Sequence, residues 1–177
     1  MNNRLILALG LVVVCNSVVA SQPYAGQQQR EIKSLSGKQI DGLLNGKGMG
    51  MAKPAELNHY PGPKHVLEVR DKLNLSQQQL QQTQKFFDEM KKEAMALGEL
   101  IVIQERQLDQ LFASGAVDNK NLSETLNRIA LLRGQLRYVH LKTHLRQKNI
   151  MTAQQIKHYD VIRGYGSGKH HMHKHDH

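Results

Sequence analysis

Histidine is the residue type in this chain that could do chemistry. Seven of the ten histidines in its 177 residues fall into two clusters. The first cluster is the segment HLKTH, with His140 and His144 four residues apart. The second is the C-terminal sequence KHHMHKHDH, which contains His170, His171, His173, His175 and His177. Neutral imidazole is a good ligand for zinc, copper and nickel, so both clusters indicate binding of a divalent transition metal.

His140 and His144 lie one turn apart on a helix, so both imidazoles point to the same side. If the chain folds back into an antiparallel helix pair, Glu89 and Glu93 lie opposite them. Two histidines, a carboxylate and an open position form a reasonable zinc site. His65, just inside a predicted helix, is a supplementary ligand candidate. The alternative is a pair of half-buried structural histidines that hydrogen-bond to those carboxylates.

The C-terminal histidines follow an irregular spacing, interrupted by Met172, Lys174 and Asp176. Such His-x-His spacings bind nickel, copper or zinc readily but without fixed geometry, so we expect metal capture with poor selectivity. Met172 adds a soft ligand suited to copper(I). The alternative is a solvated tail that becomes cationic below about pH 6.5.

A long helix is predicted to carry Glu89 and Glu93, since one apolar register runs from Ser76 to the turn at Ser114 and Gly115. Its steps alternate between three and four residues, which is typical of a heptad seam and excludes strands. The positions are Leu80, Thr83, Phe87, Met90, Ala94, Leu97, Ile101, Gln104, Leu108 and Leu111. At 1.5 Å per residue this helix is about 55 Å long. Phe87 lies on the seam, so we expect the neighbouring Phe86 to be exposed.

A second long helix follows the turn, capped by Asp118 or Asn119, and a short helix begins at Thr152. Upstream, Ser36 with Gln39 forms a possible capping box. The fold class is therefore all-α, a long antiparallel helical hairpin with flanking short helices. One hairpin cannot bury both of its faces, so the flanking helices or a second copy must cover the rest, and we expect a homodimer.

The first twenty residues have the pattern of a signal peptide. Arg4 precedes an apolar run too short to span a bilayer, and SVVA predicts cleavage after Ala20. Cleavage removes Cys15, the only cysteine, so the mature protein has no disulfide. The expected organisation is a signal peptide (1–20), a flexible N-terminal region with short helices (21–63), the hairpin domain (64–165) and a disordered His-rich tail (166–177).

The formal net charge of +9 favours acidic partners or anionic surfaces. Scarce aromatic residues, the absence of tryptophan and the export signal argue against nucleic acid as a partner. No catalytic triad, phosphate-binding loop or paired-acid pattern stands in a credible context, so we do not expect an enzyme.

Two segments, LSQQQ (75–79) and MTAQQ (151–155), resemble the L-T-x-x-Q motif that occurs twice in the Spy/CpxP family of periplasmic proteins. The upstream sequence ELNHYPGPKHVLE resembles the heavy-metal-sensor-like branch of that family. The resemblance implies a periplasmic, all-helical and usually dimeric protein. It also implies that His140 and its i+4 partner His144 are used as in the sensor branch.

The family's members include chaperones, an envelope-stress regulator, a zinc-responsive protein and a metal sensor. We therefore expect a periplasmic protein that captures or senses zinc, copper or nickel. The alternative is an ATP-independent chaperone or stress-response adaptor. Its partners would be unfolded periplasmic proteins or a membrane-bound sensor or regulator.

Overall fold

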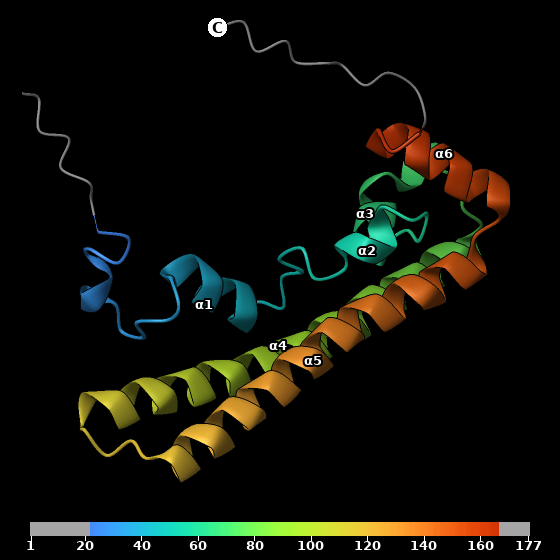
Figure 1. Ribbon diagram of the computed structural model, residues 1–177. Helices are drawn as coiled ribbons and strands as arrows, with labels where there is room; N and C mark the ends of the chain where they lie inside the picture. Colours follow the sequence, from blue (N-terminus) through green and yellow to red (C-terminus); the bar gives the residue numbers. More distant parts are fainter. Residues whose placement is uncertain (1–21, 167–177) are drawn as a thin grey trace, which may run out of the picture.

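The computed structural model describes residues 22–166, which form helices and contain no strand (Figure 1). The elements in chain order are η1 (Gln27–Gln29), α1 (Gly37–Leu44), α2 (Lys53–Glu56), α3 (Pro63–Glu68), η2 (Arg70–Lys72), α4 (Gln77–Ala113), α5 (Asn119–Ile150) and α6 (Ala153–Arg163). The predicted all-helical class is confirmed, as is the packing of two long helices together. None of the described helices is both long and apolar enough to cross a membrane.

Local side-chain chemistry sets where the main helices begin. Four helices start with a capping box, in which the N-cap side chain accepts a hydrogen bond from the backbone N–H of the third helical residue, and the side chain of that residue accepts one from the N-cap backbone N–H. The pairs are Ser36 with Gln39, Ser76 with Gln79, Asp118 with Asn121 and Thr152 with Gln155. Each box satisfies backbone N–H groups that have no partner inside the helix.

α4 and α5 run antiparallel, as the cross-contacts along their length show. Arg133 is 2.6 Å from Glu105 near the loop end, and Arg146 is 2.8 Å from Glu89 near the open end. Apolar residues from both helices and from α1 form the main core, including Ile101, Leu132 and Leu136. The pair is therefore a rigid platform for the segments that pack on it.

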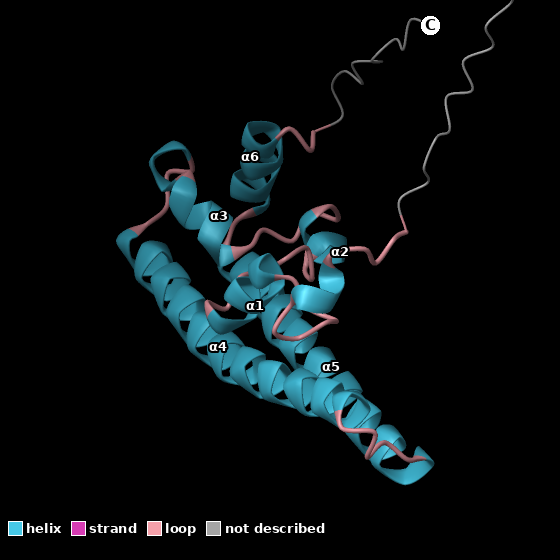
Figure 2. Cartoon of the chain, turned by 90° about the vertical axis from the view of Figure 1, so that its left-hand side faces the viewer, coloured by secondary structure: helices cyan, strands magenta, loops and turns pink. Residues whose placement is uncertain are grey.

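The shorter helices gather on one side of α4 and α5, and no helix of the described residues covers the opposite side (Figure 2). Ile32 and Leu35 are 0% and 3% exposed and belong to the core, so the segment before α1 packs on the helix pair. α1 approaches α4 closely at Gly98, where an added Cβ would lie 2.0 Å from the carbonyl oxygen of Leu43. Only glycine permits this contact.

Phe86 corrects one expectation. The side chain is 9% exposed and the Arg146 guanidinium lies 4.1 Å above the ring centroid, so the prediction that Phe86 is exposed is wrong. The buried stripe of α4 runs through Thr83, Phe86, Met90 and Ala94, close to the 3.6-residue period of a straight helix. Phe87 is half-buried at the edge of that stripe.

The two motif glutamines also hold the open end of the helix pair together. The Gln79 Nε2 donates to Gln155 Oε1 at 2.9 Å, and the Gln155 Nε2 donates to Gln79 Oε1 at 3.0 Å. Gln79 also donates to the carbonyl of Ile150 at 2.7 Å. The starts of α4 and α6 are thus joined by a reciprocal amide pair.

Candidate functional site

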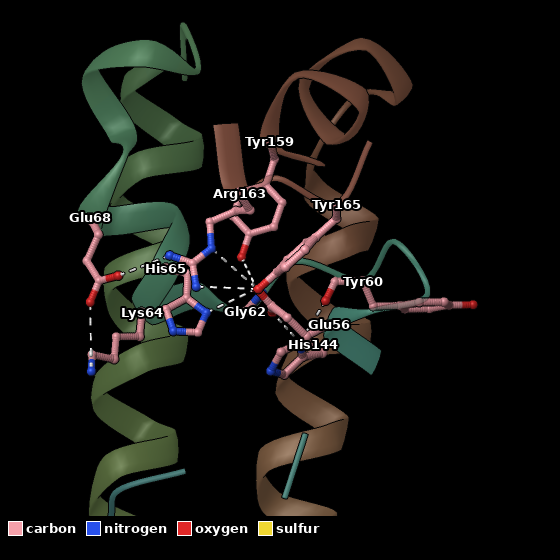
Figure 3. Close-up of polar contacts among 10 residues, drawn as sticks. All are labelled: Glu56, Tyr60, Gly62, Lys64, His65, Glu68, His144, Tyr159, Arg163 and Tyr165. Carbon is pink, nitrogen blue, oxygen red and sulfur yellow. Dashed lines mark hydrogen bonds and ion pairs between the residues drawn. The ribbon is translucent and has the colours of Figure 1, made fainter. Parts of the chain in front are cut away.

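Glu56, at the end of α2, is a buried carboxylate on which several segments converge (Figure 3). It is 8% exposed. The Tyr159 hydroxyl donates to Oε1, and the Nδ1 of His65 lies 3.1 Å from the same oxygen. The backbone N–H of Gly62 donates to Oε2 at 3.2 Å. We call Glu56, His65, His144, Tyr159 and Arg163 the Glu56 cluster.

Positive and hydrogen-bonding groups stabilise the charged form of Glu56. Burial raises the pKa of this carboxyl most, but hydrogen bonds from His65 and Tyr159 and the charge interactions with His65 and His144 together outweigh burial, and the pKa lies below its usual value. The Arg163 Nε is 3.8 Å from Oε1, and the His144 Nδ1 is 3.7 Å from Oε2. Burial and the Glu56 charge raise the pKa of Tyr159, so the phenol stays a donor.

His144 and His65 both have Nδ1 engaged by an oxygen. The His144 Nδ1 is 2.7 Å from the carbonyl oxygen of Tyr60, and the His65 Nδ1 faces Glu56. A carbonyl oxygen can only accept, so Nδ1 of His144 carries the proton and Nε2 keeps its lone pair. This arrangement is typical of metal-ligating histidines, whose other nitrogen donates to a carbonyl or carboxylate.

His140 is one turn away on α5 and is 3% exposed. Its Nε2 is buried without a hydrogen-bond partner in residues 22–166. Burial, followed by the nearby His144, lowers the pKa of His140. Burial also lowers the pKa of His144, against the opposing effect of the hydrogen bond to Tyr60. Both imidazoles are therefore neutral at pH 7, the form that binds metal.

His144 packs directly against Gly62, a close approach that requires a glycine. A Cβ there would lie 2.9 Å from the His144 Nε2, 2.7 Å from its Cε1 and 3.4 Å from Glu56 Oε2. Imidazole nitrogens and a carboxylate oxygen are a donor set that zinc, copper and nickel accept. No three His, Cys, Asp or Glu side chains in residues 22–166 stand preassembled as a metal-binding group. An ion would therefore draw the imidazoles together from their present positions.

The carboxylates expected opposite His140 and His144 pair with basic residues of α5. Glu89 pairs with Arg146 at 2.8 Å, and Glu93 pairs with Lys142 at 2.7 Å. The structure instead brings Glu56 to His144 and places His65 on the same carboxylate.

The role of Glu56 was missed because its partners come from α3, α5 and α6. No local pattern around PAELNHYPGP marks this glutamate. His170, His171, His173, His175 and His177 lie outside the described residues.

His59 marks the edge of the site. It has φ of 65°, in the left-handed region, and its Nδ1 is 2.6 Å from Asp160 Oδ2. This contact joins the α2–α3 loop to α6, next to Tyr159.

No family model matches the chain, and neither a curated protein nor a solved structure is significantly similar to it.

Proposed function

We propose that this chain is a periplasmic protein that binds a divalent transition metal, zinc, copper or nickel, at His140, His144 and His65. One observation carries the proposal: His65 of α3 and His144 of α5 both lie at the buried carboxylate of Glu56, and an oxygen atom orients the Nδ1 of each imidazole. The unpartnered Nε2 of His140 supports it, because buried polar atoms normally have partners.

Metal binding would fix the α2–α3 segment against α5. A ligand that favours one arrangement over another shifts the population toward it, and this shift is how binding becomes a signal. The five C-terminal histidines would add capture of low selectivity. The resemblance of LSQQQ and MTAQQ to the Spy/CpxP motif supports a role in metal resistance or envelope stress.

Calorimetric titration of zinc, copper and nickel tests the proposal. Two chains are compared, both starting at Ser21, one complete and one ending at Tyr165. We expect the shorter chain to bind one ion, and the complete chain to bind further ions with less selectivity. Loss of all binding with the tail would reject a site in the folded domain and leave only capture by the tail.

Variants of the shorter chain then locate the site. The double variant His140→Ala with His144→Ala should abolish binding, whereas His158→Ala, which changes an exposed histidine of α6, should not. Glu56→Gln should weaken zinc binding by about tenfold or more, as removal of an orienting partner does. Glu89→Gln should leave zinc binding unchanged. Weaker zinc binding in Glu89→Gln, with unchanged binding in Glu56→Gln, would instead place the site between α4 and α5.

A second function, as an ATP-independent chaperone or stress-response adaptor, is favoured by exposed apolar side chains on α5. Leu131, Tyr138 and Leu145 are 52%, 64% and 52% exposed and are seven residues apart, so they share one face. Such a face suits a second copy of the chain in a homodimer, an unfolded protein or a membrane-bound regulator.

Protection of an unfolding client from aggregation tests this function. A chaperone should protect equally well with a chelator present, and Tyr138→Lys should reduce protection. Light scattering on the same variant reports the dimer. If Tyr138→Lys changes neither protection nor mass, this face has neither role.

A further inference from the structure

A pocket of about 590 Å³ lies between α1, the loop after it and α5. This volume is within the range of about 300–1,000 Å³ that small-molecule sites span. The pocket shares no lining residue with the Glu56 cluster. It is thus a separate feature of the fold, and neither function proposed above uses it.

The wall of this pocket is apolar. Leu35, Leu43 and Leu136 are each 3% exposed and line it from the N-terminal segment, α1 and α5. Met49 and Met51 line it from the loop after α1. Methionine is unbranched and polarizable, so this side of the pocket can adapt to a flexible chain.

The charged residues that line the pocket are all cations: Lys38, Lys47, Arg133 and Arg137. Lys47 pairs with Asp41, and Arg133 pairs with Glu105. Within residues 22–166, no ion pair involves Lys38 or Arg137. Among these described residues no carboxylate lines the pocket, so Lys38 and Arg137, both exposed at its rim, have no counter-charge there.

The Met49 wall depends on an unusual backbone. Met49 has φ of 43°, a left-handed conformation that costs free energy for a residue other than glycine. A Cβ on Gly42 would lie 2.4 Å from the Met49 Sδ, so the thioether packs directly against the glycine backbone of α1. The loop is therefore held where Met49 lines the pocket.

We infer that this pocket binds a fatty acid. The acyl chain lies against the leucines and methionines, and the carboxylate lies at Lys38 and Arg137. Burial of the chain supplies the attraction, since it removes apolar surface from water. The unpaired cations select the anionic head group, because a guanidinium matches a carboxylate with two parallel hydrogen bonds.

The test is calorimetry on the chain from Ser21 onward, with dodecanoate below its micelle concentration. Dodecyltrimethylammonium and dodecyl maltoside carry the same alkyl chain with a cationic and an uncharged head group. We expect one dodecanoate per chain, bound at least tenfold more tightly than the cationic compound. Equal binding of dodecanoate and dodecyltrimethylammonium, or no saturable binding of dodecanoate, would overturn the inference.

Charge-matched variants test the role of the rim. Lys38→Gln with Arg137→Gln should weaken dodecanoate binding about tenfold and leave dodecyl maltoside binding unchanged. The control, Arg128→Gln with Lys157→Gln, removes two exposed cations that do not line the pocket. An equal loss of dodecanoate affinity in both double variants would show attraction by net charge alone and reject the assignment.

The methionine methyl groups report the location of the bound chain. In NMR spectra of methyl-labelled protein, dodecanoate should shift the signals of Met49 and Met51. Met151, which is buried in a different apolar cluster, should not shift. Unchanged Met49 and Met51 signals at saturation would place the ligand elsewhere and overturn the inference.

Discussion

The region around Glu56 and the region around α1 pack on the same helix pair by different means. Around Glu56, groups from α3 and α6 and the backbone N–H of Gly62 hydrogen-bond to the buried carboxylate, while the Nε2 of His140 and the Nε of Arg163 have no hydrogen-bond partner in residues 22–166. Around α1, apolar side chains and the close approach at Gly98 pack the segment against the helix pair, and a pocket remains. The first region is specified by charge and hydrogen bonding, and the second by shape.

The apolar cores show the same contrast. The core that includes α1 has ten buried residues, whereas the one beneath α6 has four: Val66, Leu73, Met151 and Tyr159. Tyr159 belongs to the smaller core and also donates to Glu56. Since a small core supplies little burial free energy, we infer that the α6 end depends on its polar contacts.

The largest expected effect is at the polar end. Glu56→Ala leaves Tyr159 and the Gly62 N–H without their acceptor, and leaves Arg163 without its nearest carboxylate. Loss of one partner of a buried charged network costs about 4 kcal/mol in unfolding free energy. Urea unfolding followed by circular dichroism measures it.

The matched control is Glu89→Ala, which removes a partly exposed carboxylate paired with Arg146. It should change the urea midpoint little, because exposed ion pairs contribute little to stability. If Glu56→Ala and Glu89→Ala have similar midpoints, the Glu56 cluster does not hold the α6 end.

In the apolar region around α1, the corresponding disruptive substitution is Gly98→Ala. The new methyl group meets the Leu43 backbone, which cannot move without displacing α1, so we expect a loss of about 3 kcal/mol. Gly134→Ala is the control, because nothing lies within 4 Å of its Cβ position on α5. It should stabilise the protein by up to about 1 kcal/mol through helix propensity alone. Thermal unfolding that ranks the two variants in the opposite order would contradict the close approach.

Sequence predicted the features that depend on neighbouring residues. Each capping box joins residues three apart, so the box of Ser36 with Gln39 was predicted correctly. The choice between Phe86 and Phe87 was not, because a straight helix drifts from a strict heptad register. The α4 stripe therefore shifts by one residue at this point.

The site was predicted only in part. The i, i+4 spacing shows that His140 and His144 share a face, but not which segment covers that face. The covering segment is the loop around Gly62, whose path depends on packing between α2, α3 and α6. For this reason the sequence did not indicate Glu56, and Glu89, which was expected to face the histidines, pairs with Arg146 instead.

The pH dependence of stability sharpens the comparison, because the buried histidines of residues 22–166, His140 and His144, both lie at the polar end. Burial lowers the pKa of His140 and of His144 below the usual value near 6.5. Between the folded-state pKa and 6.5 the unfolded chain binds more protons, so unfolding free energy falls as pH falls from about 7 toward 5. Each histidine contributes a slope of up to about 1.4 kcal/mol per pH unit in that window.

Urea unfolding with a chelator, at several pH values from 7.5 to 5, measures this slope. His140→Gln should reduce the slope, whereas His158→Gln, at an exposed position, should not. Below pH 4.5 the protonation of Glu56 should add a further loss, since the pKa of this carboxyl is lowered and its stabilisation disappears as pH falls through that pKa. A flat profile between pH 7 and 5 would mean that the histidines are not buried.

The smallest expected effect concerns the reciprocal amide pair at the open end of the helix pair. Gln79→Ala and Gln155→Ala each remove a capping box and one half of the pair, so each should cost about 1–2 kcal/mol. If the two amides stabilise each other, the double variant should lose about 1 kcal/mol less than the sum of the single variants. Gln78→Ala, at an exposed neighbouring position, is the control and should add independently to either variant.

Strict additivity of Gln79→Ala and Gln155→Ala would reduce both glutamines to separate helix caps. Coupling between them would instead mean that the closing glutamines of the two motifs join α4 to α6. In that case the pair fixes the end at which α6 delivers Tyr159 and Arg163 to Glu56. A weak contact between two local motifs would then control the geometry of a site that neither motif contains.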